Sequence, residues 1–469
     1  MQDNSQKQKT LKNLALWVNS PICADKTLES IYFNNVNMDS RKLKNGDIFV
    51  ALKGEAQDGH DFIKSAFNNG AVAAIVGKKW YEENRKNFNE FCLIPVEDTL
   101  ASIQRAAREY RRILRIPVIA VGGSNGKTST TLMLKTLLSK SFKIGSTIGN
   151  FNNHIGVPLS VLSLDGDEEF AVFELGANHC GEIAELTTII EPDMGVITNI
   201  GFDHVGLFGG IEKTAEANFE LARAVSIKRG IMLLNGDDER SVAQNEIDMV
   251  QSYYFGLEIG NQIRAENLSC NEFGCYSFDY NGFRYEIPMV GAHCVYSLLP
   301  ALYFAQSFGI SPYILQEVVK NELKPANMRG EIEIIASRKI IADCYNANPS
   351  SMAVALKMLD DIPTPAKRIA VLGTMGELGE YEEELHKEVG ASLVNFKTDK
   401  LIAVGERAKT IADAAISAGF LKENVFVCAN AEEAGKIAFD NSGENDLILF
   451  KGSRSVGLEK AIAAFSATR

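Results

Sequence analysis

One segment constrains the fold of this chain more than any other: residues 118–138, VIAVGGSNGKTSTTLMLKTLL. An apolar run leads into a glycine-containing loop, and the loop leads into a helix that opens with Lys-Thr. A buried strand, a glycine turn and a helix in this order are typical of a parallel sheet covered by helices. The segment therefore predicts an α/β fold.

The loop in this segment has the residues of a phosphate-binding site. Glycines let backbone N–H groups converge on a phosphate, Lys127 supplies a mobile cation, and the Thr128 hydroxyl suits Mg²⁺. The strict pattern has a glycine five residues before Gly126, where this chain has Val121, so the loop is the shorter GxxGKT form. A glycine turn with an incidental lysine is the alternative interpretation. The residues expected to bind ATP are Gly123, Ser124, Asn125, Gly126, Lys127, Thr128 and Ser129.

Length and charge limit the classes of protein that fit. A chain of 469 residues exceeds what one hydrophobic core usually serves, so we expect two or three domains. The formal net charge of -12 argues against a broad nucleic-acid surface, because phosphate backbones are held by clustered lysines and arginines. The phosphates of a nucleotide must therefore be bound locally, by loop amides and a few cations.

Neither a signal peptide nor a membrane span is expected. Residues 1–20 lack a continuous apolar core, and nowhere do about 18 uninterrupted apolar residues occur. We expect a cytoplasmic enzyme. The eight cysteines lack CxxC pairs, which indicates reduced thiols rather than disulfides or zinc ligands.

Strand and helix patterns alternate along the chain. Residues 31–97 have the pattern of short strands and helices, a small α/β unit. Residues 98–114 carry apolar side chains at helical spacing, with Asp98 or Thr99 available as the helix cap. From Ile116 onward, strands alternate with helices, which implies a mainly parallel sheet.

The best linker lies near residue 325, where NELKPANMRGE separates two patterned regions. A second alternating series of strands and helices follows it. We therefore expect an α/β protein with three domains, at residues 1–97, 98–325 and 326–469, of which the central one holds the phosphate loop on its parallel sheet.

Two further strand ends offer metal ligands. Glu174 follows the run AVF, and His204 follows the run GVITNIGFD. Mg²⁺ prefers oxygen ligands, so the carboxylate is natural and the histidine less usual. A buried, paired carboxylate is the alternative for Glu174. The ends of parallel strands are where open α/β sheets place binding residues, which favours the functional interpretation of both residues.

Six short sequence motifs together resemble those of the Mur ligase superfamily of peptidoglycan synthesis. They are GGSNGKT, ELGANHCGEIAEL, ITNIGFDH, MRGE, DCYNANPSSM and LGTMGELGEYEEELH, in colinear order over nearly the whole chain. The resemblance implies an N-terminal domain for the UDP-sugar, a central ATPase and a C-terminal Rossmann-like domain. Within the superfamily, DSRKLKNGDIFVALKGEAQDGHDF and YNANP are similar to ligases that add D-alanyl-D-alanine to UDP-N-acetylmuramoyl-tripeptide.

The resemblance also implies the reaction. The tripeptide carboxylate would attack the γ-phosphate of ATP to give an acyl phosphate, and the amine of the dipeptide would displace phosphate. Lys127 and an Mg²⁺ ion on Thr128 and Glu174 would neutralise the two anions, and His204 would suit a second Mg²⁺.

Further site residues follow from the matched family positions. Those implied for the nucleotide are Arg329 and Asp343, either of which, taken singly, could form a surface ion pair. Those implied for the UDP-sugar are Asp39, Ser40, Arg41 and Lys53. Those implied for the muramyl-peptide are Thr147, Asn150, Asn152, Asn153, Asn178 and His179. Those implied for the remaining substrate contacts are Tyr345, Asn346, Asn348, Lys451 and Arg454, the basic turn being suited to the dipeptide carboxylate.

The chain departs from the family pattern at polar positions. Where these ligases carry a carbamylated lysine, this chain aligns Asn218. We therefore expect either that Glu216 or Glu220 substitutes for the carbamylated lysine, or that the second Mg²⁺ is held more loosely. We also expect Asn218→Lys to leave activity intact or to raise it. Cys294 and Ser297 replace the asparagines of the adenine-contact word, and Thr374 replaces an aspartate.

Other functions stay open on the sequence. A sibling ligase that adds a single amino acid and folylpolyglutamate synthase share the central motifs, and Asn218 leaves room for a non-catalytic nucleotide-binding relative. The expected assembly is a monomer. Which diamino acid the tripeptide carries depends on pocket shape, which the sequence does not specify.

Overall fold

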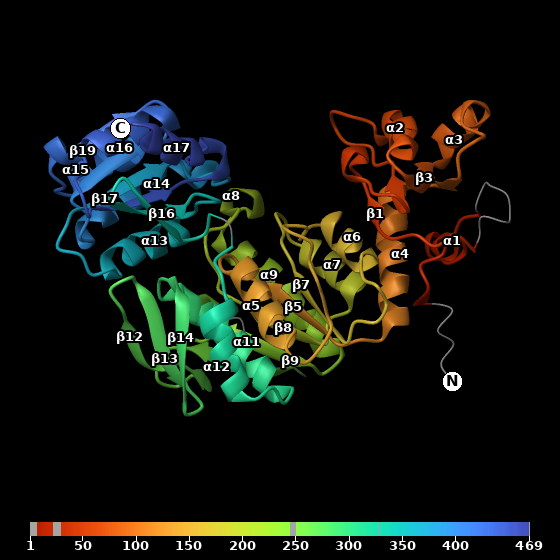
Figure 1. The fold of residues 1–469 in the computed structure, drawn as a ribbon, viewed down its shortest axis with the longest axis horizontal. Helices are drawn as coiled ribbons and strands as arrows, with labels where there is room; N and C mark the ends of the chain where they lie inside the picture. Colours follow the sequence, from red (N-terminus) through yellow and green to blue (C-terminus); the bar gives the residue numbers. More distant parts are fainter. Residues whose placement is uncertain (1–6, 22–29, 244–249, 327, 469) are drawn as a thin grey trace. The chain divides into compact units, whose positions relative to one another are not determined.

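The structure is a computed structural model that describes residues 7–21, 30–243, 250–326 and 328–468. Within these ranges the strands form four sheets in a mixed α/β chain (Figure 1). The chain divides into two compact units, one with Met1–Ala120, Phe142–Ala177 and Gly181–Met194, the other with Val121–Ser141, Asn178–Cys180 and Gly195–Arg469. The α/β class predicted from the sequence is confirmed.

The N-terminal sheet is parallel and has the strand order β1-β2-β3-β4. Its strands are β1 (Val36–Asn37), β2 (Asp47–Val50), β3 (Ala71–Gly77) and β4 (Leu93–Val96). The helices of this region are α1 (Leu11–Val18), α2 (Ile63–Asn68), α3 (Lys78–Asn84) and α4 (Thr99–Leu114). The predicted helix of residues 98–114 is confirmed, and Asp98 is its cap, because its side chain accepts a hydrogen bond from the Ala101 N–H.

The central sheet has seven strands in the order β11-β10-β9-β8-β5-β7-β6. They are β5 (Val118–Gly122), β6 (Ile144–Ser146), β7 (Phe170–Glu174), β8 (Met194–Ile197), β9 (Ile231–Asn235), β10 (Gln251–Gly256) and β11 (Ile263–Arg264). Between and after them come α5 (Lys127–Leu138), α6 (Gly156–Leu162), α7 (Glu182–Ile190), α8 (Val205–Phe208), α9 (Ile211–Ile227), α10 (Glu239–Ala243), α11 (His293–Ser307) and α12 (Pro312–Glu322). The strand, loop and helix expected at residues 118–138 are β5, the phosphate loop and α5.

A three-stranded antiparallel sheet was not expected from the sequence. It consists of β12 (Glu266–Cys270), β13 (Cys275–Tyr280) and β14 (Phe283–Val290). Asn281 and Gly282 join the last two strands with φ values of 50° and 80°. An Asn-Gly pair with two positive φ angles is the strongest short hairpin signal, so the sequence did contain the information.

The C-terminal sheet has the order β15-β16-β20-β17-β18-β19, with β15 antiparallel and the others parallel. Its strands are β15 (Glu331–Ile335), β16 (Arg338–Asp343), β17 (Arg368–Gly373), β18 (Lys400–Val404), β19 (Val425–Cys428) and β20 (Leu447–Lys451). Its helices are α13 (Pro349–Asp361), α14 (Glu382–Ser392), α15 (Lys409–Ser417), α16 (Ala431–Asp440) and α17 (Glu459–Ala467).

Helices cover both faces of the C-terminal sheet. Along β17, Ala370 and Leu372 belong to one buried cluster, and Ile369 and Val371 belong to another, as the two-residue period of a strand requires. The first cluster takes in α13, α14 and α15, and the second takes in α16 and α17. This is the doubly wound arrangement of a Rossmann-like domain. Among the described helices, none combines the length and hydrophobicity that a bilayer crossing requires.

Candidate active site

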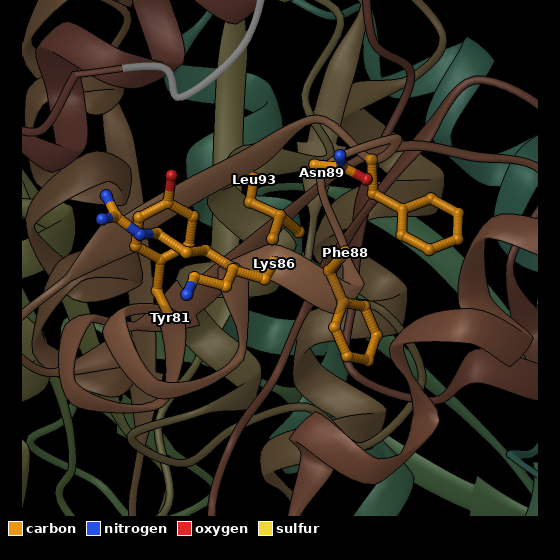
Figure 2. Close-up of a pocket in the computed structure, with 7 residues that line it drawn as sticks. Tyr81, Lys86, Phe88, Asn89 and Leu93 are labelled. Atoms are coloured by element: carbon orange, nitrogen blue, oxygen red, sulfur yellow. The ribbon is translucent and has the colours of Figure 1, made fainter.

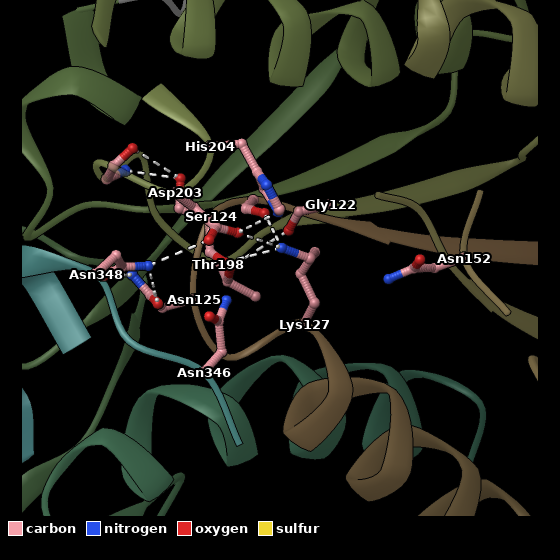
Figure 3. Close-up of polar contacts among 12 residues, drawn as sticks. Gly122, Ser124, Asn125, Lys127, Asn152, Thr198, Asp203, His204, Asn346 and Asn348 are labelled. Atoms are coloured by element: carbon pink, nitrogen blue, oxygen red, sulfur yellow. Dashed lines mark hydrogen bonds and ion pairs between the residues drawn. The ribbon is translucent and has the colours of Figure 1, made fainter. Parts of the chain in front are cut away.

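The phosphate loop connects β5 to α5 through two glycines with left-handed backbone. Gly123 has φ +115° and Gly126 has φ +85°. A side-chain carbon at Gly123 would lie 2.2 Å from the Thr198 Oγ1 atom, so only glycine fits there. Figure 3 shows the loop residues Ser124 and Asn125 close to Thr198. The loop backbone therefore lies directly on the segment that follows β8.

That segment, residues 198–201, holds the loop through reciprocal hydrogen bonds. The Asn125 N–H donates to Asn199 Oδ1 at 3.2 Å, and Asn199 Nδ2 donates to the Asn125 carbonyl at 2.9 Å. Ser124 Oγ donates to the Gly201 carbonyl at 3.1 Å and accepts from the Gly201 N–H at 2.8 Å. The sequence analysis did not include Asn199, although the polar residues that follow β8 indicated a binding segment there.

Asn218 supports the loop from helix α9. Its side chain is buried, its Oδ1 accepts from the Gly123 N–H at 2.7 Å, and its Nδ2 donates to the Thr214 carbonyl at 2.8 Å. A lysine has no acceptor for the Gly123 N–H. This contact argues against the expectation that Asn218→Lys is neutral or favourable, because Asn218 is a structural partner of the loop.

Lys127 opens helix α5 and faces a buried carboxylate. Its Nζ donates to the carbonyls of Gly123 and Ser124, both at 2.8 Å, and lies 3.4 Å from Asp203 Oδ2 (Figure 3). Asp203 is 8% exposed. The ammonium group is thus stabilised by its own loop and by one carboxylate, in a place where phosphate oxygens can replace the carbonyls. Sequence reasoning missed Asp203, although it directly precedes His204.

His204 lies between two carboxylates. It has φ +52° and caps α8, its Nε2 lies 3.6 Å from Asp203 Oδ2, and its Nδ1 forms an ion pair with Glu377 when protonated. The Gly206 N–H donates to the Glu377 carbonyl at 3.2 Å. A side-chain carbon at Gly206 would lie 2.3 Å from the Gly379 nitrogen, so glycine permits this close approach. Glu377 is a second residue that the sequence interpretation did not include.

The carboxyl ends of β16 and β20 bring three predicted site residues together. Asp343 and Lys451 are register partners, and Lys451 Nζ lies 3.0 Å from Asp343 Oδ2. The same Nζ donates to the Asn346 carbonyl at 2.7 Å, and Lys451 is only 3% exposed. Lys451 therefore forms an internal ion pair. Arg454 is exposed, and its Nη1 lies 3.7 Å from Glu459 Oε1.

Two more predicted residues stack on each other. The Arg329 guanidinium lies 4.5 Å from the centre of the Tyr345 ring. A cation over an aromatic face is attracted by the negative electrostatic potential over that face, so the pair orders both side chains. Neither side chain is buried, which leaves both able to contact a ligand.

Asn348 caps helix α13 and also contacts the phosphate loop. Its side chain is 3% exposed and forms a capping box with Ser351. Its Nδ2 donates to Asn125 Oδ1 at 3.0 Å and to Asp203 Oδ1 at 3.3 Å. Asn348 of the YNANP motif thus contacts the phosphate loop and Asp203. Asp203 in turn pairs with Lys127.

In the other compact unit, three residues predicted for metal and muramyl-peptide lie together. Glu174 ends β7 and is 3% exposed; its Oε1 accepts from Asn152 Nδ2 at 2.8 Å, and its N–H donates to Thr147 Oγ1 at 2.8 Å. Asn153 instead uses its Oδ1 to hold the turn before α6, accepting from the Gly156 N–H at 2.9 Å. Asn150 of the same unit is exposed, and so are Asn178 and His179, which belong to the unit that holds the phosphate loop.

Three of the residues predicted for the UDP-sugar, Asp39, Ser40 and Arg41, form a local turn. Asp39 accepts from the Arg41 N–H and from two guanidinium nitrogens, and the Arg41 side chain is exposed. These hydrogen bonds lower the pKa of Asp39 to about 2. Ser40 is buried between them, and Lys53 is exposed.

A pocket in the same region has a different lining. Figure 2 shows it at α3, the short helix Arg85–Asn87 and β4, with Tyr81, Lys86 and Phe88 among the residues that surround it. The residues predicted for the UDP-sugar are not part of this lining.

Comparison with known proteins places this geometry in one family. The Mur ligase family catalytic domain matches residues 32–119, the Mur ligase middle domain matches residues 121–305, and the Mur ligase glutamate ligase domain matches residues 329–454. A UDP-N-acetylmuramoyl-tripeptide–D-alanyl-D-alanine ligase of Bacillus subtilis is 35% identical over 97% of this chain and 98% of its own length. The chain belongs to the Mur ligase family.

Solved structures of the family agree in fold. MurF from Acinetobacter baumannii is 28% identical, with a TM-score of 0.86 over 98% of this chain and 99% of that one. MurF from Thermotoga maritima, crystallised with ADP, is 26% identical, with a TM-score of 0.79 over 93% of this chain and 97% of that one. The Mur ligase resemblance and the three-domain family architecture predicted from the sequence are confirmed.

Proposed function

We propose that this chain is an ATP-dependent ligase that joins D-alanyl-D-alanine to UDP-N-acetylmuramoyl-tripeptide in peptidoglycan precursor synthesis. The observation that carries the proposal is the end-to-end match with the Bacillus subtilis ligase of that name. The phosphate loop, with its lysine opening α5, supports the use of ATP.

The loop residues fit the phosphates of ATP. The two left-handed glycines keep side chains away from the loop backbone, and Lys127 can exchange its bonds to loop carbonyls for bonds to phosphate oxygens. From the C-terminal domain, Asp343 is proposed to accept from ribose hydroxyls and Arg329 to bind phosphate oxygens. The Lys451 pair holds the Asp343 carboxylate at the end of its strand.

Mg²⁺ is part of the proposal, on Thr128 and Glu174, with a second ion on His204. The donors are a half-buried hydroxyl, a buried carboxylate and an imidazole flanked by the carboxylates of Asp203 and Glu377. Hydroxyl and carboxylate oxygens suit Mg²⁺, and an imidazole is the less usual ligand. A bound ion would neutralise charge between the substrate carboxylate and the triphosphate.

In the proposed reaction the chain lowers the repulsion between two anions. A carboxylate oxygen of the tripeptide forms a bond to the γ-phosphorus, and the bond to ADP breaks, while Lys127 stabilises the charge on the phosphoryl oxygens. The dipeptide amine then bonds to the acyl carbon, phosphate leaves with its electron pair, and the amine gives up a proton.

We propose the substrate contacts and domain boundaries as the family positions imply. The N-terminal domain, residues 1–97, would bind the UDP-sugar through the turn at Asp39 and through Lys53. The central domain is proposed to span residues 98–325 and the C-terminal domain residues 326–469. The segment from Tyr345 to Asn348 would face the dipeptide.

Phosphate release from ATP tests the proposal. Purified protein is given UDP-N-acetylmuramoyl-tripeptide with either D-alanyl-D-alanine or single amino acids, and the product mass is determined. We expect release, and a product heavier by the dipeptide, only when the dipeptide is present. Equal release with a single amino acid would favour a sibling ligase, and no release with any acceptor would favour a non-catalytic relative.

A further inference from the structure

The side chain of Asn348 joins helix α13 to the phosphate loop through an amide pair. Asn348 Nδ2 donates to Asn125 Oδ1 at 3.0 Å, and Asn125 Nδ2 lies 3.5 Å from Asn348 Oδ1 (Figure 3). The same Asn348 Nδ2 lies 3.3 Å from Asp203 Oδ1. One buried amide, 223 positions from its partner in the sequence, thus contacts both the loop and the carboxylate that faces Lys127.

The capping box fixes which way the Asn348 amide points. Its Oδ1 accepts from the Ser351 N–H at 2.8 Å, while the Asn348 N–H donates to Ser351 Oγ at 3.0 Å. The oxygen is therefore held at the helix end, and the NH₂ group must face Asn125 and Asp203. An aspartate here would cap α13 equally well but would place a second carboxylate against Asp203.

The loop side of the contact is equally constrained. The Asn125 backbone is held in both directions by Asn199. Next to it, a side-chain carbon at Gly201 would lie 2.9 Å from Ser350 Oγ, so the start of α13 packs closely on the segment that supports the loop. The loop, its supporting segment and the start of α13 are therefore in close contact.

We infer that Asn348 is a positioning residue that couples occupancy of the phosphate loop to the placement of residues 343–348. The inference rests on the proposed function, in which the loop holds ATP and Tyr345 and Asn346 face the dipeptide. When phosphates draw Lys127 away from Asp203, the Asn348 amide stays as a hydrogen-bond donor to that buried carboxylate. Without the competing Lys127 ammonium, the Asp203 carboxylate depends more on the Asn348 donor, so nucleotide binding should tighten this contact.

Turnover of three variants tests the inference. Asn348→Ser keeps a good helix cap and removes the amide, Asn125→Ser removes the partner amide, and the double variant removes both. We expect each single variant to lower kcat about tenfold, the usual value of one buried hydrogen bond, with a smaller change in KM for ATP. The double variant should be no slower than the slower single variant, because both substitutions remove the same interaction.

Asn430→Ser is the matched control. Asn430 caps α16 through the same bond, from the Glu433 N–H at 2.9 Å. We expect this variant to keep wild-type kcat. A control as slow as Asn348→Ser, or additive losses in the double variant, would overturn the coupling.

Hydrogen exchange without dipeptide separates this inference from the proposed function. In the wild type, ADP should slow exchange of peptides that span residues 344–352, and in Asn125→Ser it should not. If ADP slowed exchange of residues 344–352 equally in both proteins, the inference would be overturned, whichever substrate the enzyme uses. Slowing in the wild type alone, with no dipeptide-dependent turnover, would leave the coupling intact and sink the proposed function.

Discussion

Lys127 is the single residue on which the proposed phosphoryl transfer depends most directly. In Lys127→Ala the glycines keep the loop backbone, because the loop conformation rests on Gly123 and Gly126 rather than on the ammonium group. We expect phosphate release to fall by about a hundredfold or more, with little change in the melting temperature. The matched control is Lys140→Ala, at a lysine that pairs with Glu322 away from the loop. Turnover within a few-fold of wild type in Lys127→Ala would contradict the assigned role.

Asn218 carries a prediction of a different kind, because its role is to hold the loop backbone. Asn218→Lys leaves the buried Gly123 N–H without its acceptor, which costs about 1–3 kcal/mol. We expect weaker ADP binding by calorimetry and a lower melting temperature. Asn218→Asp, which keeps an acceptor oxygen, should bind ADP more tightly than Asn218→Lys. The reverse order would mean that the hydrogen bond to Gly123 does not support the loop.

At the scale of elements, His386 ties helix α14 to the segment that carries Glu377. The ring is 1% exposed, and its Nε2 accepts from the Met375 N–H at 3.0 Å, which requires the neutral form. Burial lowers the pKa of His386 below its ordinary 6.5. Between the lowered pKa and 6.5 the unfolded chain binds more protons, so this contribution to stability is complete above about pH 6.5 and is lost as the pH falls.

His386→Gln tests this contribution, because glutamine offers an acceptor oxygen that does not titrate. We expect the melting temperature of the wild type to fall more than that of the variant between about pH 7 and about pH 5. Each unit by which the folded pKa lies below 6.5 corresponds to about 1.4 kcal/mol. Parallel pH profiles would show that His386 does not titrate in this window.

The elements that the sequence predicted well are those whose signals are local. The strand, loop and helix of residues 118–138 follow from adjacent residues, and so does the cap at Asp98. The contacts that hold the site in shape join distant residues, such as Asn125 with Asn348, 223 positions apart. Hydropathy periods carry no information on such pairs, which is why Asp203 and Asn199 were missed and the hydrogen bond between Asn218 and Gly123 was not expected.

At the scale of the whole molecule, the proposed boundary near residue 325 predicts that the C-terminal segment folds alone. Residues 326–469 hold all six strands of one sheet and the helices on both its faces, and their length is typical of a domain. One of its two buried clusters also includes Val205 and Val290 from the preceding region. Separating residues 326–469 from the preceding region therefore exposes apolar surface that the full chain covers. The fragment should be less stable than the same region within the full chain.

We expect the fragment of residues 326–469 to be monomeric at low concentration, to show mixed α/β circular dichroism and to unfold in one cooperative transition. Its melting temperature should lie below that of the full chain, because apolar contacts of Val205 and Val290 contribute about 25 cal/mol per Å² buried. Substituting exposed Ile334, at 76% exposure, by Thr serves as the control and should leave that temperature nearly unchanged. A fragment without cooperative unfolding would place the boundary elsewhere and would make the central and C-terminal regions one folding unit.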